Sequence, residues 1–430
     1  MTDVAPLTSI PEAPIPPGGG AEWIAGAGLA PLRAAFFSPK GRARGSVVLS
    51  TGRTECIEKY FEVIGELLDR GFVVLAQEWR GQGLSHRELP DRLKGHASGY
   101  QSYLDDYRAL LAAFEARLPK PWIAVGHSMG GCLTLLALSK GEAAHFAGAV
   151  LSAPMLGVRM PPMAGVMVWF KLLTGKGDDY ASPPPADPYT EAFEGNRLTG
   201  DRKRFARARA LIAANRDLAL SAPTWGWIDF ALKATRHLGV AANLRSVTLP
   251  VVIVSAANDK LVTDTAQRAA AANLPDGKFV SVPGSEHEIL METDDKRAVF
   301  WAEFDALSDR IAPRPAAEAK AAPAAKAAPA KAAKAAPRTP AAKAAPKPAA
   351  KAAPPPAARK PAAPKQTVAK PAPKAAAKAK AAPKAAAKPV AAVKSAAKPV
   401  PPKPVAKAPK AARSAPAKAT TKPKPAGRKA

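Results

Sequence analysis

The chain of 430 residues has only two cysteines, Cys56 and Cys132, and no long apolar run. Two cysteines give neither a disulfide framework nor a metal-ligand spacing, and they fit a reducing compartment. No segment reaches the roughly 18 consecutive apolar residues that a membrane-spanning helix requires. The N-terminus also lacks a positively charged segment followed by an apolar stretch, so we predict no secretory signal peptide. We therefore expect a cytoplasmic protein.

Aromatic residues are missing from the C-terminal segment 311–430, which contains no Phe, Trp or Tyr. This segment holds 25 of the 46 prolines, and Ala and Lys fill most of the rest. Its 29 basic residues and one acidic residue account for the whole net charge of +28, which leaves 34 residues of each sign in 1–310. A segment of this composition can bury too little apolar surface to offset the conformational entropy that folding costs. Its frequent prolines also interrupt helices. We predict a disordered basic tail.

The composition of the tail resembles the alanine-, lysine- and proline-rich tails of linker histones. We expect it to attract nucleic acid or an anionic membrane without sequence preference. The membrane alternative would hold the protein at the inner face of the membrane.

The remaining chain predicts a large α/β domain over residues 21–310, preceded by a flexible segment, 1–20, that is rich in Pro and Gly. Short continuous apolar runs indicate strands that are buried on both faces. Such runs lie at 46–50, 72–76, 122–126, 147–151, 251–254 and 279–282. Helical patterns separate them, at 58–70, 104–118, 129–138, 263–272 and 296–307. This alternation predicts a mostly parallel central sheet flanked by helices.

A candidate nucleophile, Ser128, lies between an expected strand and an expected helix in the pentapeptide Gly126-His127-Ser128-Met129-Gly130. This is a G-x-S-x-G sequence in the strand-to-helix context that a nucleophile elbow requires. The glycines allow a turn so tight that the serine side chain is lifted above the sheet edge. The N–H of Met129 would then face a developing oxyanion at a helix N-terminus.

A serine nucleophile needs a base, and His287 is our candidate. It follows the last expected strand, and loops at the carboxyl ends of strands form the sites of open α/β sheets. His237 is the alternative, but it lies in an Arg-flanked helical stretch. Asp259 follows the preceding strand and would orient the imidazole. Its competitor, Asp264, fits better as the first residue of a helix.

A second oxyanion donor is expected in the loop after the first strand of the domain. That loop contains Thr51-Gly52-Arg53, and the N–H of Arg53 is our candidate donor.

Several blocks together resemble the lysophospholipase and monoacylglycerol lipase group of α/β-hydrolases, also described as serine aminopeptidase-like hydrolases. The blocks are Gly52-Arg53, Glu78 to Ser85, Gly126 to Gly131, Asn258 to Val262 and Gly284 to Leu290. The resemblance implies the α/β-hydrolase fold and ester hydrolysis through an acyl-enzyme on Ser128, without a metal or organic cofactor. The family often has His-Gly where this chain has Thr51-Gly52, and Asp where it has Glu78.

An insertion of about 95 residues, far longer than a simple crossover needs, separates two of the expected strands. We expect a helical cap over about 155–245. Its Met and aromatic residues suit an adaptable apolar pocket, and Met155, Trp169 and Trp225 are candidate substrate contacts. Packing within the cap is the alternative role, and the stretch 163–173 could instead contact a lipid surface.

The sequence thus predicts a serine esterase that acts on lysophospholipid or monoacylglycerol. An aminopeptidase or small-ester hydrolase is the alternative within the same class. A polyanion-binding protein with an incidental hydrolase domain is the alternative of another class. The presence of all three expected triad residues favours catalysis.

Overall fold

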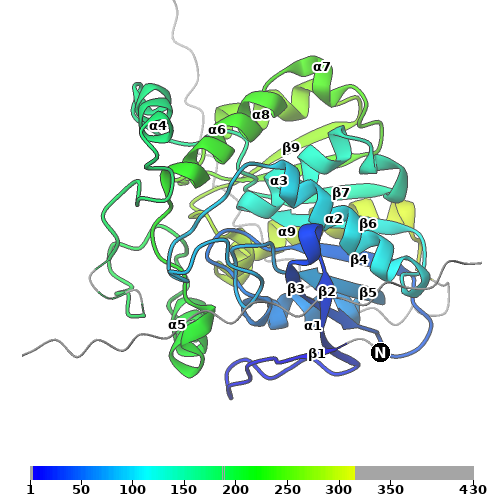
Figure 1. Ribbon diagram of the computed structural model, residues 1–430. Coiled ribbons are helices and arrows are strands. Elements are labelled where there is room, and N and C mark those ends of the chain that lie inside the picture. The colour runs from blue at the N-terminus through cyan, green and yellow to red at the C-terminus, as the bar shows by residue number, and fades with distance from the viewer. Residues whose placement is uncertain (1–2, 186, 188, 315–430) are drawn as a thin grey trace, which may run out of the picture. The chain divides into compact units, whose positions relative to one another are not determined.

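The computed structural model describes residues 3–185, 187 and 189–314 (Figure 1). The predicted tail, 311–430, lies outside these residues from 315 onward, so its disorder there and its binding partners stay predictions. Its expected start is too early, because Ile311 ends the last described helix and Ala312 is buried, with its carbonyl oxygen bonded by Arg44. Within the described part of the chain, no helix has the length and apolar character needed to cross a membrane.

The core of the domain is a nine-stranded sheet in the order β1-β2-β3-β5-β4-β6-β7-β8-β9. The strands are β1 (Val4–Ala5), β2 (Gly19–Ala25), β3 (Pro31–Phe37), β4 (Gly45–Ser50), β5 (Phe72–Gln77), β6 (Trp122–His127), β7 (Gly148–Ser152), β8 (Val251–Ala256) and β9 (Gly277–Val282). In this spatial order, the six strands from β5 to β9, which include β4, pair in parallel. The strands β1, β2, β3 and β5 pair antiparallel with their neighbours in that part of the sheet. The expected mostly parallel sheet is confirmed.

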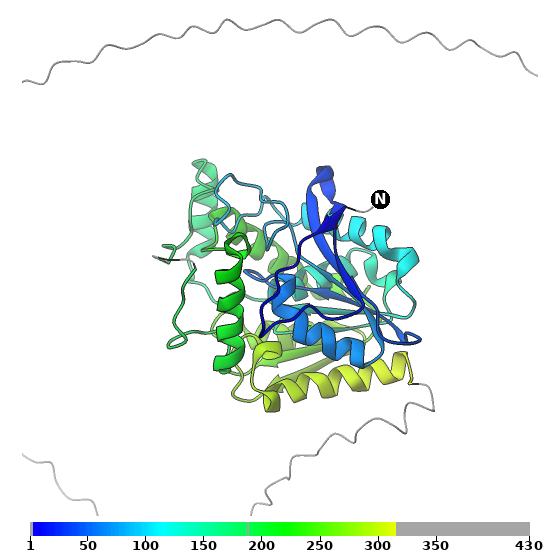
Figure 2. The ribbon, with the colours of Figure 1, turned by 90° about the horizontal axis from the view of Figure 1, so that it is seen from below.

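Helices cover both faces of this sheet (Figures 1 and 2). They are α1 (Phe61–Asp69), α2 (Gln101–Phe114), α3 (Ser128–Ser139), α4 (Ala164–Leu173), α5 (Arg202–Ala214), α6 (Trp225–Leu238), α7 (Ala241–Leu244), α8 (Asp264–Asn273) and α9 (Asp294–Ile311). The apolar residues of α1 and α9 share one core, and those of α2, α3 and α8 share the other.

The position of the central strands between two layers of helices explains why their sequences are continuously apolar. In β4, Val47 and Leu49 belong to the core beneath α1 and α9, whereas Val48 belongs to the opposite core. Successive side chains of a strand point to opposite faces, so a strand with a helical layer on each side has no solvent-facing position.

The expectation of a flexible segment over residues 1–20 is wrong for residues 3–20. β1 pairs with β2, and the side chains of Ala5 and Ala13 are each only 4% exposed. Backbone pairing with β2 and small buried side chains hold this segment at the edge of the sheet, although it is rich in proline and glycine.

Four helices, α4 to α7, lie between β7 and β8 and form the expected cap. Cap helix α5 is attached to the sheet domain by ion pairs with Glu62 of α1. Arg204 and Arg207 each reach its carboxylate at 2.6 Å. Burial would raise the pKa of Glu62, but the hydrogen bonds from both arginines and the charge of Arg297 lower it to about 2.

Candidate active site

A strained turn between β6 and α3 carries Ser128. Its φ of +49° lies in the left-handed region, which costs a non-glycine residue roughly 1–2 kcal/mol. A Cβ on Gly126 would lie 2.8 Å from the Cα of Gly131, and one on Gly130 would overlap carbonyl oxygens at the end of β4. Both flanking positions therefore require glycine, as the elbow motif predicts.

Ser128, His287 and Asp259 come together although three different strands position them. The Nε2 of His287 lies 2.8 Å from the Oγ of Ser128, and its Nδ1 lies 2.6 Å from the Oδ2 of Asp259. Burial would raise the pKa of Asp259, but the hydrogen bond and charge of His287 and two backbone N–H groups lower it. Asp259 is therefore a carboxylate at neutral pH, suited to accept the Nδ1–H of the imidazole.

Neither alternative residue reaches this constellation. His237 lies on α6, where its ring and backbone contact Asn243. Asp264 is the first residue of α8, the position expected of a helix N-terminal carboxylate.

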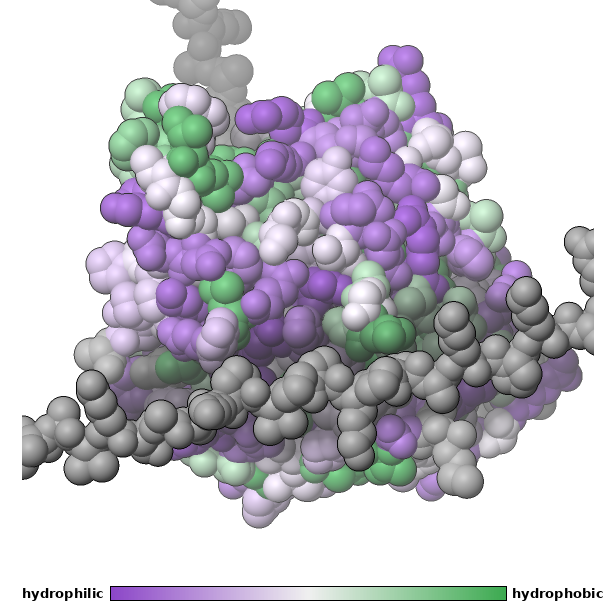
Figure 3. Space-filling model, viewed as in Figure 1, coloured by the Kyte–Doolittle hydropathy of each residue, from purple (hydrophilic) through white to green (hydrophobic). Residues whose placement is uncertain are grey.

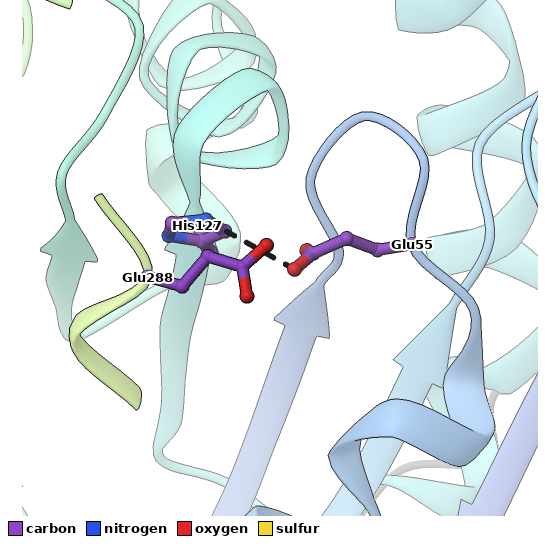
Figure 4. A group of neighbouring side chains, drawn as sticks. All are labelled: Glu55, His127 and Glu288. Carbon is purple, nitrogen blue, oxygen red and sulfur yellow. Dashed lines mark ion pairs between the residues drawn. The ribbon is translucent and has the colours of Figure 1, made fainter. Parts of the chain in front are cut away.

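A buried ion cluster supports the loop that follows β4. The Glu55 carboxylate accepts the Gly52 N–H, and the Nζ of Lys59 lies 2.9 Å from Glu55 and 2.6 Å from Glu288. Figure 4 shows Glu55, His127 and Glu288 converging from the loop after β4, the end of β6 and the loop after β9. Burial would raise the pKa of Glu55, but the charges of Lys59 and His127 lower it to about 2.

This cluster has the residue types of a metal site, since ligand atoms of Glu55, His127 and Glu288 lie within 4.8 Å of one another. The ammonium of Lys59, however, already forms ion pairs with both carboxylates. Burial also lowers the pKa of His127, whose Nδ1 lies 3.1 Å from the carbonyl oxygen of Ser152. These contacts explain the cluster as a structural ion pair network.

A cavity of about 680 Å³ opens above Ser128 and His287, between the sheet domain and the cap. Ser128, His287 and both expected oxyanion donors, Arg53 and Met129, line it. Among the described residues, neither the Arg53 N–H nor the Met129 N–H has a protein acceptor. An oxyanion in the cavity would supply the acceptor that both donors lack.

The structure brings two of the three expected substrate contacts to this cavity. Met155 and Trp225 line it, whereas Trp169 does not and is 63% exposed on α4. The expected Met and aromatic residues of the cap also contribute Met160, Met163, Met167 and Trp227 to the lining. The lining residues that the sequence did not indicate are Ile228 and the basic Arg159, Arg197 and Lys260. These three basic residues lie in loops, where no helical or strand periodicity marks a position at the site.

One side of α4 presents an apolar surface to solvent, visible as green spheres at the upper left of Figure 3. Its exposed side chains are Met163, Val166, Met167, Trp169, Phe170, Leu172 and Leu173. Met163 and Met167 also line the cavity, so this surface adjoins the cavity.

Comparison with known proteins agrees with this geometry. The family described as serine aminopeptidase, S33, matches residues 41–294. The chain belongs to this hydrolase family.

Relatives of this S33 hydrolase include lysophospholipase L2 of Escherichia coli strain K12, which is 31% identical over 59% of this chain and 77% of its own length. Monoacylglycerol lipase of Mycolicibacterium smegmatis is 25% identical over 63% of this chain and 91% of its own. A monoglyceride lipase structure from Saccharomyces cerevisiae covers 70% of this chain and 97% of its own with a TM-score of 0.54. At 17% identity this last likeness concerns the fold alone. The chain is thus an α/β-hydrolase similar to lysophospholipases and monoacylglycerol lipases.

Proposed function

We propose that this protein hydrolyses the carboxylic ester of a lysophospholipid or monoacylglycerol through an acyl-enzyme on Ser128. The observation that carries the proposal is the unbroken hydrogen-bond chain from Ser128 through His287 to Asp259 at a cavity. The apolar walls of the cavity and the adjoining exposed surface of α4 suit a substrate with an acyl chain.

The reaction begins when the Oγ of Ser128 attacks the ester carbonyl carbon and its proton passes to the Nε2 of His287. The N–H groups of Arg53 and Met129 donate to the oxyanion that forms. As the intermediate collapses, His287 protonates the leaving alcohol. Water then attacks the acyl-enzyme, again giving its proton to His287, and the fatty acid leaves as Ser128 regains its hydrogen.

The charge of the cavity disfavours the aminopeptidase alternative. A substrate with a free amino group needs an acidic partner, and Glu288 is the one acidic residue among the described residues that line the cavity. Its carboxylate is already bonded to Lys59 at 2.6 Å.

The decisive experiment is Ser128→Ala, assayed on p-nitrophenyl esters, lysophosphatidylcholine and a proline-peptide amide. We expect a loss on the order of 10⁶ in kcat, because only oxyanion binding remains without the nucleophile. Ser139→Ala, at the other end of α3, is the matched control, since its hydroxyl bonds only to the carbonyl of Leu136. Residual activity above a tenth in Ser128→Ala, or turnover of the amide alone by the wild type, would overturn the proposal.

A second, accessory function follows from the segregation of charge in the sequence. The net charge of +28 resides beyond residue 310, in a segment without aromatic residues. Lysines on such a chain would bind nucleic acid or anionic lipid by releasing counterions, without base stacking. A chain ending at Pro313 should keep soluble-ester turnover but lose low-salt binding in gel shifts and vesicle sedimentation. Equal binding by both chains would contradict this role.

A further inference from the structure

Four basic side chains line the cavity above Ser128: Arg53, Arg159, Arg197 and Lys260. None of them forms an ion pair with a carboxylate of the described residues. The acidic residue of the lining, Glu288, is ion-paired with Lys59, whose ammonium also contacts Glu55. The cavity is therefore cationic, although residues 1–310 carry equal numbers of acidic and basic residues.

Arg53 is the most deeply enclosed of these cations. Its guanidinium lies over the ring of Trp227, 5.2 Å from the centroid, and donates to the carbonyl oxygen of Ser221. Its Nε has no hydrogen-bond partner among the described residues. An enclosed cation without a counter-ion is destabilising, so an anion in the cavity beside this guanidinium would compensate its charge.

The electrostatics of Arg53 agree with this geometry. Burial lowers the pKa of its guanidinium to about 10, against smaller opposing effects of Tyr103 and Tyr180. The group is still a cation at neutral pH, in surroundings that disfavour the charge.

Arg159 is a second cation with a fixed position. Its Nε lies 3.2 Å from the carbonyl oxygen of Asp259 and 3.1 Å from that of Val262. These contacts attach it to the loop that carries the triad carboxylate, and they leave its charge uncompensated by any described carboxylate. The cavity thus combines anchored cations with the apolar walls formed by residues such as Met155 and Ile228.

We propose that the cavity selects esters that carry a phosphate group, and that the side chains of Arg53 and Arg159 hold this phosphate. The proposal rests on the proposed esterase function and chooses lysophospholipid over monoacylglycerol as the preferred substrate. Only the short glycerol backbone separates the phosphate of a lysophospholipid from its ester carbonyl. The Arg53 side chain extends from the same residue whose N–H is the expected oxyanion donor, so it starts beside that carbonyl. Its planar fork matches two phosphate oxygens.

The test compares kcat/KM for lysophosphatidylglycerol and for monoacylglycerol with the same acyl chain, in nonionic mixed micelles at constant ionic strength. Arg53→Met and Arg159→Met keep an unbranched apolar side chain and the backbone N–H but remove the guanidinium and its charge. Each should reduce the preference for the phosphate-bearing ester about tenfold or more, as expected for the loss of a charge-assisted hydrogen bond. Arg53→Lys, which keeps the charge without the fork, should fall between Arg53→Met and the wild type.

The matched control is Arg42→Met, because Arg42 is exposed and lies before the N-terminal end of β4. The cavity lies at the other end of the parallel strands, beyond their carboxyl ends. The ratio of its kcat/KM for lysophosphatidylglycerol to its kcat/KM for monoacylglycerol should equal that of the wild type. The basic tail is common to all variants, so its attraction to anionic micelles cancels in the comparison.

Binding to Ser128→Ala protein separates this proposal from the proposed function. Adding Arg53→Met there should weaken binding of lysophosphatidylglycerol about tenfold more than binding of monoacylglycerol. Phosphate-dependent binding without turnover of either lipid by the wild type would overturn the esterase function alone. An unchanged preference in both arginine variants would overturn the selection of phosphate. Inhibition by inorganic phosphate with an unchanged lipid preference would also overturn it, and would assign the cations to a free anion.

Discussion

The two carboxylate oxygens of Asp259 have different partners, and this difference predicts the effect of Asp259→Asn. Oδ1 accepts the N–H groups of Leu261 and Val262 at 2.8 and 3.0 Å. Oδ2 lies 2.6 Å from the Nδ1 of His287. An asparagine side chain here must keep its carbonyl oxygen toward the two backbone donors, because its NH₂ group would otherwise face two N–H groups.

The NH₂ group of the substituted side chain would therefore face the Nδ1 of His287 and require a lone pair on it. The imidazole proton would then reside on Nε2, so the ring would donate to Ser128 and could not accept its proton. We expect a loss on the order of 10⁴ in kcat, which corresponds to about 5 kcal/mol of transition-state stabilisation.

The assay is the acylation burst with a p-nitrophenyl ester at neutral pH, together with the unfolding temperature. Asp264→Asn is the matched control, since it removes a nearby charge at the start of α8 without touching His287. A burst rate above a tenth of wild type in Asp259→Asn would refute the tautomer reasoning. An equal loss in Asp264→Asn would do the same, as would unfolding of the Asp259→Asn protein.

Three further changes test other parts of the structure. Gly130→Ala would drive a Cβ into backbone oxygens at the end of β4 and should lower stability by roughly 1–3 kcal/mol and reduce ester turnover, both measured on purified protein. Because folding lowers the pKa of Glu62 from 4.5 to about 2, its stabilising contribution is complete above pH 4.5 and lost as the pH falls through 2. Glu62→Gln should therefore lower the unfolding temperature at pH 7 and change it little near pH 2. Trp169→Ser on the exposed side of α4 should weaken vesicle binding severalfold, in sedimentation assays, without changing turnover of soluble esters.

The parallel half of the sheet could be predicted because burial on both faces leaves a local signature, but the antiparallel half could not. β3 contains Arg33, whose side chain is fully buried, and a buried cation within a strand argues locally against a core position. Its charge is compensated by Glu58 and Glu78, 25 and 45 residues further along the chain. Only the fold brings these partners together, so no local pattern in the sequence indicates a strand there.

The meeting of Ser128, Asp259 and His287 could be predicted because each follows a strand of a parallel sheet, and the carboxyl ends of such strands meet at one edge. Residues of the cap follow no comparable rule. Trp225 and Trp169 both belong to apolar helical stretches, yet Trp225 lines the cavity and Trp169 faces solvent. Which side of a cap helix faces the site depends on its packing against the sheet domain, which spacing in the sequence does not specify.

Thr51, which precedes Gly52 where the resemblance led us to expect histidine, also has a local explanation. The hydroxyl of Thr51 donates to the carbonyl oxygen of Gln77 at 3.1 Å, between the adjacent strands β4 and β5. The next residue, Gly52, is held by Glu55 instead. The conformation of the loop at the proposed oxyanion donor therefore does not require a histidine at position 51.

The buried ion cluster connects the two loops on which the proposed chemistry depends. Glu55 holds the N–H of Gly52, which immediately precedes the proposed oxyanion donor, and Glu288 immediately follows His287. One ammonium, that of Lys59, bonds both carboxylates, although Lys59 and Glu288 are 229 residues apart in the chain. Removing either carboxylate would break one of the two ion pairs of Lys59 and release one of the two loops. The cluster beneath the cavity thus couples the position of His287 to that of the loop around Arg53.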